Sequence, residues 1–115
     1  MGQLGNLVTE LKTEYDPLII SRDERKCALC GGTGNHVHEV LSKSKFSIID
    51  IRACIQPKNM VLLCMRHHGM VQGMPQWSGH LLRLLHERYG YEYEERPFDW
   101  YFYHEYPTEE DIGSL

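Results

Sequence analysis

Apolar residues at the start of the chain follow the spacing of an amphipathic helix. One face of such a helix would carry Leu4, Leu7, Val8 and Leu11. The pattern predicts a short helix over residues 3–14 that covers the core. We expect this helix to stop near Asp16-Pro17, because proline removes a backbone donor and crowds the preceding turn.

The pattern changes in the middle of the chain. The stretch HVHEVL, which begins at His36, carries β-branched residues and predicts a strand. Residues 43–58 contain FSIIDIRACI, which fits a second strand or a short helix equally well. Pro57 interrupts whichever element precedes Asn59. The sequence therefore predicts one strand here and leaves the next element open.

Helical periodicity returns after the apolar run MVLLCM. It predicts a helix from Met65 to about Gln72 and a longer one from Gln76 to Tyr89, in which leucines flank charged residues. Gly90 should end the longer helix, because glycine readily adopts the left-handed conformation found just past a helix C-terminus.

The tail alternates aromatic and acidic residues and carries most of the negative charge. The stretch YEYEERPFDWYFYHEYP favours an edge strand or an extended segment whose aromatics serve as core and interface, and the last eight residues are expected to be mobile. Residues 87–115 hold nine acidic and two basic residues, a balance of −7, whereas residues 21–66 hold eight basic and four acidic residues, a balance of +4. The middle of the chain could meet a polyanion, and the tail would repel one.

Length and composition bound the class of protein. A chain of 115 residues with 42% hydrophobic residues builds one modest α+β domain. The apolar runs are too short to span a bilayer, and no secretory signal is recognisable, so we expect a soluble, cytoplasmic protein without membrane contact. The expected parts are an N-terminal helix at 1–20, a metal-bound core at 21–75, a second helix at 76–90 and an acidic aromatic tail at 91–115.

The cysteines predict a metal site, because thiols of a cytoplasmic protein stay reduced. Cys27 and Cys30 form one CxxC pair, and Cys64 and His67 form a second pair with the same spacing. Two such pairs are typical of a tetrahedral structural zinc site. Cys54 or His36 could replace His67 as the fourth ligand. Otherwise Cys54 is expected to be a small core residue.

His67 and His68 are adjacent in the sequence, but on a helix their side chains point in different directions. Neighbouring side chains on a helix diverge by about 100°, so the two imidazoles cannot face one ion, while Cys64 and His67 lie one turn apart on the same face. His67 is therefore expected to bind zinc, and His68 should point elsewhere.

Residues 25–72 resemble the HNH endonucleases, a family with a ββα-metal fold. The resemblance rests on the CxxC pair, on His38-Glu39 in a strand, on Asn59, and on Cys64-x-x-His67-His68 in that order. It implies a small ββα-metal core with flanking helices, stapled by zinc. It also implies that His38 and His68 hold a second, catalytic divalent cation such as Mg²⁺, Mn²⁺, Ni²⁺ or Zn²⁺.

This sequence departs from the HNH pattern in its second pair of zinc ligands, in its strand and in its loop. The second pair, Cys64 and His67, is CxxH instead of CxxC, and the usual glycine-rich stretch after the strand is replaced by SKSKFSIIDIRACIQPK. The strand carries His38-Glu39 where the family often has Asp-His or His-His. Alignment puts Glu39 at the position of the general base, whereas strand alternation puts His36 and His38 on one face and Glu39 on the other. The base remains open among these three residues.

The resemblance implies a metal-dependent DNA endonuclease that cuts or nicks phosphodiester bonds. Its catalytic residues would be His38, Glu39, Asn59 and His68, although Asn59 is expected to hold a loop rather than to touch substrate. Similar stand-alone nucleases belong to phages and mobile elements, so a phage packaging or recombination protein is an expected partner, and the host cytoplasm the expected location. The alternatives are a non-catalytic zinc-stapled module that binds nucleic acid or protein, and an adaptor that acts through its acidic tail. Oligomeric state is left open.

The remaining polar candidates carry weaker signals. Gln72 lies one helical turn past His68, where some members supply another metal ligand, and it is otherwise a polar surface residue. His80, His86 and His104 have no motif around them and are expected to be helix-surface or packing residues.

Overall fold

The computed structural model describes residues 3–46 and 50–115, with side chains from residue 6 onward. The side chain of Leu4 and part of the undecided segment around residues 47–49 therefore lie outside the described residues. The elements in chain order are α1 Gln3–Arg22, β1 His36–Glu39, the 3₁₀ turn η1 Lys43–Lys45, α2 Ile51–Cys54, the 3₁₀ turn η2 Pro57–Asn59, β2 Met60–Leu63, α3 Met65–Val71, α4 Pro75–Tyr89, α5 Phe98–His104 and α6 Glu109–Gly113.

The two strands form a small antiparallel sheet at the centre of the molecule. His36 pairs with Leu63 and Glu39 with Met60, so the histidines of β1 lie beside the apolar strand β2. All four residues of β2 are buried, while those of β1 are half-buried. The apolar run after residue 59, which sequence periodicity left unassigned, is thus the inner strand. The prediction of an α+β domain is confirmed at this level.

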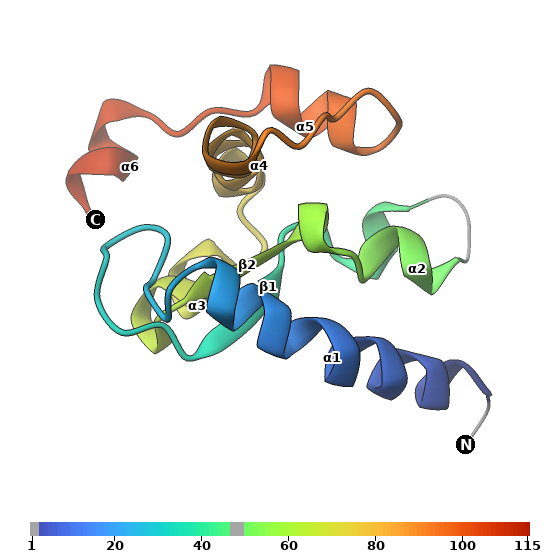
Figure 1. Cartoon of the computed structure of the whole chain (residues 1–115). Helices are drawn as coiled ribbons and strands as arrows, with labels where there is room; N and C mark the ends of the chain where they lie inside the picture. Colours follow the sequence, from blue (N-terminus) through green and yellow to red (C-terminus); the bar gives the residue numbers. More distant parts are fainter. Residues whose placement is uncertain (1–2, 47–49) are drawn as a thin grey trace.

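Helices cover the sheet from two sides (Figure 1). On one side α1 and α2 bury an apolar cluster against Met60, comprising Leu11, Ile19, Ile51, Cys54 and Ile55. On the other side α3, α4 and α5 build the larger cluster, whose fully buried side chains include Leu63, Trp77, Leu81, Leu82 and Phe98. The sheet is therefore enclosed between α1 and the C-terminal helices.

The first helix is longer than predicted, since α1 runs through Pro17 to Arg22. Proline inside a helix costs about 3 kcal/mol, and burial on both sides of it offsets this cost. Leu11 and Ile19 are 8% and 1% exposed. The Arg22 guanidinium also donates hydrogen bonds to the backbone oxygens of Pro57 and Met60 at 2.9 and 2.6 Å, which fixes the helix end to η2 and β2.

The tail is also different from the prediction, because it folds into α5 and α6 instead of an extended segment. Gly79 of α4 allows α5 to pack closely, and a Cβ there would overlap the carbonyl oxygens of Tyr101 and Glu105. Arg83 of α4 donates two hydrogen bonds to the Phe102 oxygen, at 3.0 and 2.7 Å. Residues that were expected to be mobile form α6, which a capping box opens at Thr108.

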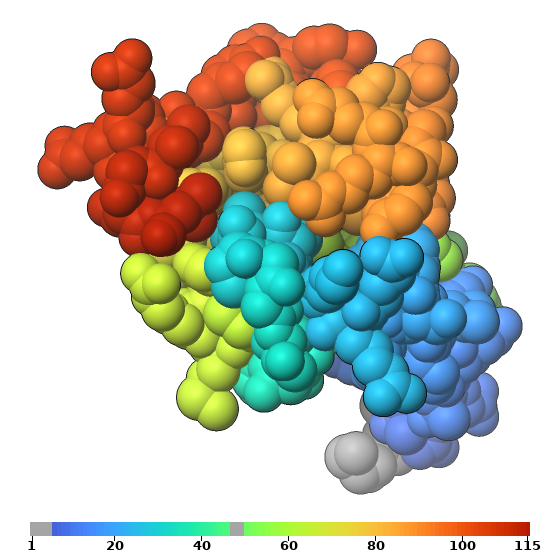
Figure 2. Space-filling model, turned by 60° about the vertical axis from the view of Figure 1, so that its left-hand side comes forward, coloured from blue at the N-terminus to red at the C-terminus, as the bar shows by residue number. Residues whose placement is uncertain are grey.

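The helices on either side of residue 74 agree with the prediction. Helix α3 covers Met65–Val71, and α4 covers Pro75–Tyr89 and ends at Gly90, whose φ of 77° is left-handed. The undecided segment contains α2, with the Asp50 side chain accepting a hydrogen bond from the Arg52 amide at 3.0 Å. Figure 2 shows α6 seated against α3, where Arg66 reaches the Ser114 oxygen at 3.2 Å.

Candidate metal centre and catalytic pocket

A tight turn presents the first cysteine pair. The amide of Cys27 donates to the Gly32 oxygen at 2.7 Å, and the Gly31 amide donates back to Cys27 at 2.8 Å. Gly31 has a φ of 73°, a conformation that favours glycine. Gly34 then lets the chain approach β2, because a Cβ at this position would overlap the Leu62 side chain.

The second pair lies at the start of α3. Cys64 is the N-cap residue, and its sulfur accepts from the His67 amide at 3.5 Å. One helical turn separates the two side chains, so both point toward the cysteine turn. The imidazole Nδ1 of His67 lies 3.3 Å from Cys64 Sγ and 3.6 Å from Cys27 Sγ.

These four side chains form a group that could hold a metal ion. Their ligand atoms all lie within 4.8 Å of one another, and the sulfurs of Cys30 and Cys64 are 4.0 Å apart. A tetrahedral ion with bonds of about 2.3 Å to sulfur and about 2.0 Å to nitrogen needs edges of about 3.8 Å between sulfurs and about 3.6 Å between sulfur and nitrogen. The distances of 3.3, 3.6 and 4.0 Å are close to these edges, and the remaining pairs, all within 4.8 Å, would draw together around an ion.

The electrostatics of the cluster favour a thiolate at one cysteine, Cys27. Burial would raise the pKa of Cys27, but hydrogen bonds from the backbone of Cys64, Cys30 and Leu29 and from His67 together lower the pKa to about 6. Metal ligation requires this deprotonated form. Cys27 and His67 are buried, while Cys30 is exposed, so the group lies at the surface with its inner half shielded.

Cys54 and His36, which sequence reasoning kept as competing ligands, are not in this group. The Cys54 thiol donates to the Leu41 oxygen at 3.5 Å, and burial, followed by the nearby Glu39, raises its pKa to about 11. His36 stacks on His68 instead.

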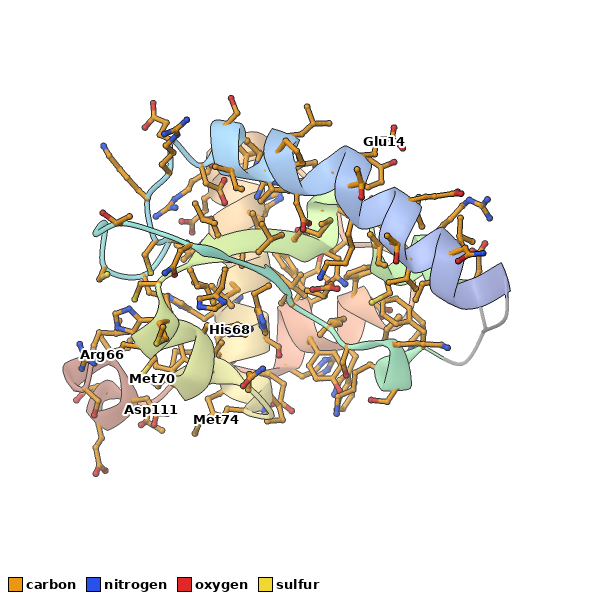
Figure 3. All side chains as sticks on the ribbon, turned by 90° about the horizontal axis from the view of Figure 1, so that it is seen from below. Glu14, Arg66, His68, Met70, Met74 and Asp111 are labelled. Carbon is orange, nitrogen blue, oxygen red and sulfur yellow. The ribbon has the colours of Figure 1, made fainter. Side chains whose placement is uncertain are left out.

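His68 belongs to a second cluster, made of histidines. Its ring stacks on His36 with centroids 4.9 Å apart and meets His38 edge-on at 5.2 Å. Figure 3 shows His68 on the side of α3 that faces the strands, whereas Arg66 lies beside α6. The adjacent residues His67 and His68 therefore lie in different clusters.

One pocket gathers three of the four residues that the sequence predicted to be catalytic. It has a volume of about 410 Å³ and lies between β1, η1, α2, α3 and the start of α4. His38, Glu39, His68 and Gln72 line it. Lys43 and Lys45 also line it, and within the described chain neither ammonium has an ion-pair partner. Sequence reasoning missed these lysines as site residues, although the SKSK stretch of the atypical loop was their signal.

The pocket histidines are poised as neutral bases or ligands. Burial, followed by the charge of His68, lowers the pKa of His38 to about 4. Burial, followed by His36, also lowers the pKa of His68. A neutral imidazole offers a lone pair to a cation or a proton, so both rings can work at neutral pH.

Glu39 lines the pocket as well, contrary to what strand alternation predicted. It is the last residue of β1, and the pocket continues past the strand end to Val8 of α1, so it takes in residues from both faces. Its Oε1 lies 3.4 Å from Lys12 Nζ, which holds the carboxylate at the pocket wall.

Asn59 has a structural task. It is fully buried and absent from the pocket wall. Its Oδ1 accepts from the Leu41 amide at 2.8 Å, and its Nδ2 donates to the oxygens of Leu41 and Cys54 at 2.9 and 2.8 Å. Asn59 therefore holds the loop after β1 through backbone hydrogen bonds, as expected of it.

The other histidines pack on neighbouring side chains, as predicted. His80 meets the edge of Trp77, His86 donates to the Tyr91 oxygen at 2.8 Å, and His104 stacks on Trp100. Across residues 3–46 and 50–115, one group of three or more His, Cys, Asp or Glu side chains lies closely enough together for a metal. It consists of Cys27, Cys30, Cys64 and His67.

Comparison of the chain with protein-family models, curated proteins and solved structures finds no match. Among the described helices, none combines the length and the apolar character needed to cross a membrane.

Proposed function

We propose that this protein is a metal-dependent DNA endonuclease of the HNH type, with a zinc-stapled ββα-metal core. The observation that carries the proposal is the pocket in which His38, Glu39 and His68 meet two lysines that have no ion-pair partner among the described residues. The order β1, β2, α3, with the Cys3His group bridging the first turn and α3, supports the same assignment. Zn²⁺ suits the donor set of Cys27, Cys30, Cys64 and His67, since thiolates and imidazole are its preferred ligands.

Catalysis would divide among the residues of the pocket. His38 and His68 would hold a divalent cation, which neutralises charge on the phosphate and the leaving oxygen. Lys43 and Lys45, which line the same pocket, would bind the phosphodiester backbone. Glu39 would accept the proton of the attacking water, with Lys12 orienting its carboxylate. Asn59 acts as a positioning residue for the loop that carries the lysines.

A plasmid-nicking assay tests the proposal. Zinc-loaded protein is incubated with supercoiled plasmid and Mg²⁺, Mn²⁺, Ni²⁺ or additional Zn²⁺. The native chain should nick, while His38→Ala and His68→Ala should lose at least about 100-fold in rate, as expected for loss of a cation ligand. His80→Gln is the matched control, since His80 lies outside the pocket. Absence of nicking with every cation, while DNA binding persists, would sink the nuclease assignment.

The second candidate is a zinc-stapled binding module without catalysis. Two observations favour this module. The pocket histidines are not gathered as closely as the Cys3His group, and the Glu39 carboxylate is already paired with Lys12. Glu39→Gln separates the two candidates, because it should stop nicking by an enzyme and leave the affinity of a binding module unchanged.

The setting of the activity is proposed from the resemblance alone. Such a nuclease would act in the cytoplasm of a host cell with a phage packaging or recombination protein that directs it to DNA. Co-purification from infected cells would test this partner.

A further inference from the structure

A second cavity adjoins the catalytic pocket. It has a volume of about 460 Å³ and is lined by Lys45, Arg96, Pro97, Trp100 and Tyr101. Lys45 also lines the catalytic pocket, so one lysine forms part of both walls. A substrate that binds Lys45 in the first pocket therefore lies next to the second cavity.

The charge of this cavity suits an anion, although it lies in the acidic tail. The Lys45 ammonium has no ion-pair partner within the described chain, and Arg96 is 78% exposed. The neighbouring acids are already engaged. Glu95 is paired with Lys58, while Asp99 accepts from the Trp100 amide at 2.8 Å and lies 3.7 Å from Arg96 Nε.

Trp100 supplies a fixed aromatic surface. Its indole is stacked on His104 with centroids 4.0 Å apart and an interplanar angle of 17°. The His104 Nδ1–H donates to the Trp100 oxygen at 3.0 Å, which holds the two rings together. Even so, Trp100 remains 43% exposed. An exposed indole beside Lys45 and Arg96 suits an unpaired nucleotide, with the base on the ring and the phosphate on the two cations, where it would compete with Asp99 for the exposed Arg96 guanidinium.

We propose that the second cavity binds an unpaired nucleotide next to the phosphodiester that lies in the catalytic pocket. Trp100 stacks on the base, Arg96 contacts its phosphate, and Lys45 bridges the two cavities. This inference rests on the proposed function, because that function puts the phosphodiester beside Lys45. It specifies the substrate as a strand with at least one base free of pairing, such as a single strand or a frayed junction.

Tryptophan fluorescence can test this site. Trp77 is 2% exposed, so the change on binding reports Trp100. Zinc-loaded full-length protein, with no second divalent cation added, is titrated with a single-stranded oligothymidylate of about 12 nucleotides. The emission should be quenched. Trp100→Ala should weaken binding about tenfold, measured by anisotropy of a labelled strand, and Trp100→Phe should keep most of the affinity.

The cations are tested through the salt dependence of the same equilibrium. Lys45→Gln and Arg96→Gln should each lower the slope of log K against log salt by about 0.7, the value for one phosphate contact on a single strand. Lys26→Gln removes the same charge from an exposed lysine outside both cavities and should leave the slope unchanged.

The outcomes separate this inference from the nuclease proposal. Quenching that depends on Trp100, without nicking by any cation, would keep the nucleotide site and refute the nuclease. Nicking that persists while Trp100→Ala binds the strand as tightly as the native chain would refute the nucleotide site alone. Equal quenching by a polyglutamate peptide would assign the cavity to an acidic peptide and overturn the inference.

Discussion

Substitution of His67 should unfold the protein, whereas substitution of the adjacent His68 should leave it folded. His67 is 1% exposed, and its Nδ1 lies 3.3 Å from Cys64 Sγ and 3.6 Å from Cys27 Sγ. The ring of His68 instead packs on the imidazoles of His36 and His38. Structural zinc sites contribute about 10–16 kcal/mol of apparent binding free energy. A domain of this size has a free energy of unfolding of about 5–15 kcal/mol. Losing a ligand of the proposed zinc site should therefore unfold the protein.

We expect His67→Ala to lose zinc and its cooperative thermal transition. His68→Ala should keep one zinc per chain and change the free energy of unfolding by less than about 1.5 kcal/mol, the cost of a ring contact. Metal analysis by mass spectrometry and thermal denaturation followed by circular dichroism measure both effects.

His67→Cys is the matched control, because a thiolate at this position restores a four-ligand zinc site. This variant should recover zinc and the thermal transition. Equal damage from His67→Ala and His68→Ala, or a folded His67→Ala protein without zinc, would refute the division of roles between the two histidines.

Three further predictions concern the scaffold and the pocket. Asn59→Ala removes the hydrogen-bond partner of the buried Leu41 amide and Cys54 oxygen, at about 1–3 kcal/mol each, so the free energy of unfolding in urea should fall by about 2–6 kcal/mol; an unchanged midpoint would contradict the loop-holding role. Gly79→Ala should force α5 away from α4, which hydrogen exchange would detect as lost protection in α5 with little change in β2. The pKa of His38 is about 4 in the folded protein and 6.5 for an ordinary histidine, so the unfolded chain binds the extra proton between these values and stability should fall, by at most about 3 kcal/mol, as pH drops from 6.5 to 4; NMR titration of the ring proton checks the pKa, and His38→Gln should remove this dependence.

The sequence predicted those features that local geometry determines. Gly90 ends α4 because the position needs a left-handed backbone, and each i, i+3 spacing brings its own pair of ligands together, Cys27 with Cys30 and Cys64 with His67. The separation of His67 from His68 follows from helix geometry in the same way.

Features set by tertiary packing were missed. Burial of Ile19 and the hydrogen bonds of Arg22 carry α1 through Pro17, against its local preference. The tail forms α5 because Gly79, which lies far away in sequence, lets it dock on α4. The hydrophobic periodicity of the tail does not indicate this contact with α4.

The candidate pocket was predicted in part. His38 and His68 could be named from their motif, but the role of Lys43 and Lys45 depends on the fold of an atypical loop over the pocket. Glu39 joins the pocket because the cavity wraps around the end of β1, whereas strand alternation alone pointed it away.

The central claim is that His38 and His68 hold a catalytic cation apart from the structural zinc. A crystal of the zinc-loaded protein soaked with Mn²⁺ tests it directly, since anomalous scattering distinguishes the two metals. We expect zinc at Cys27, Cys30, Cys64 and His67, and manganese bound to the ring nitrogens of His38 and His68 in the pocket. Manganese found only elsewhere, or a pocket that takes no ion at saturating Mn²⁺, would contradict the account.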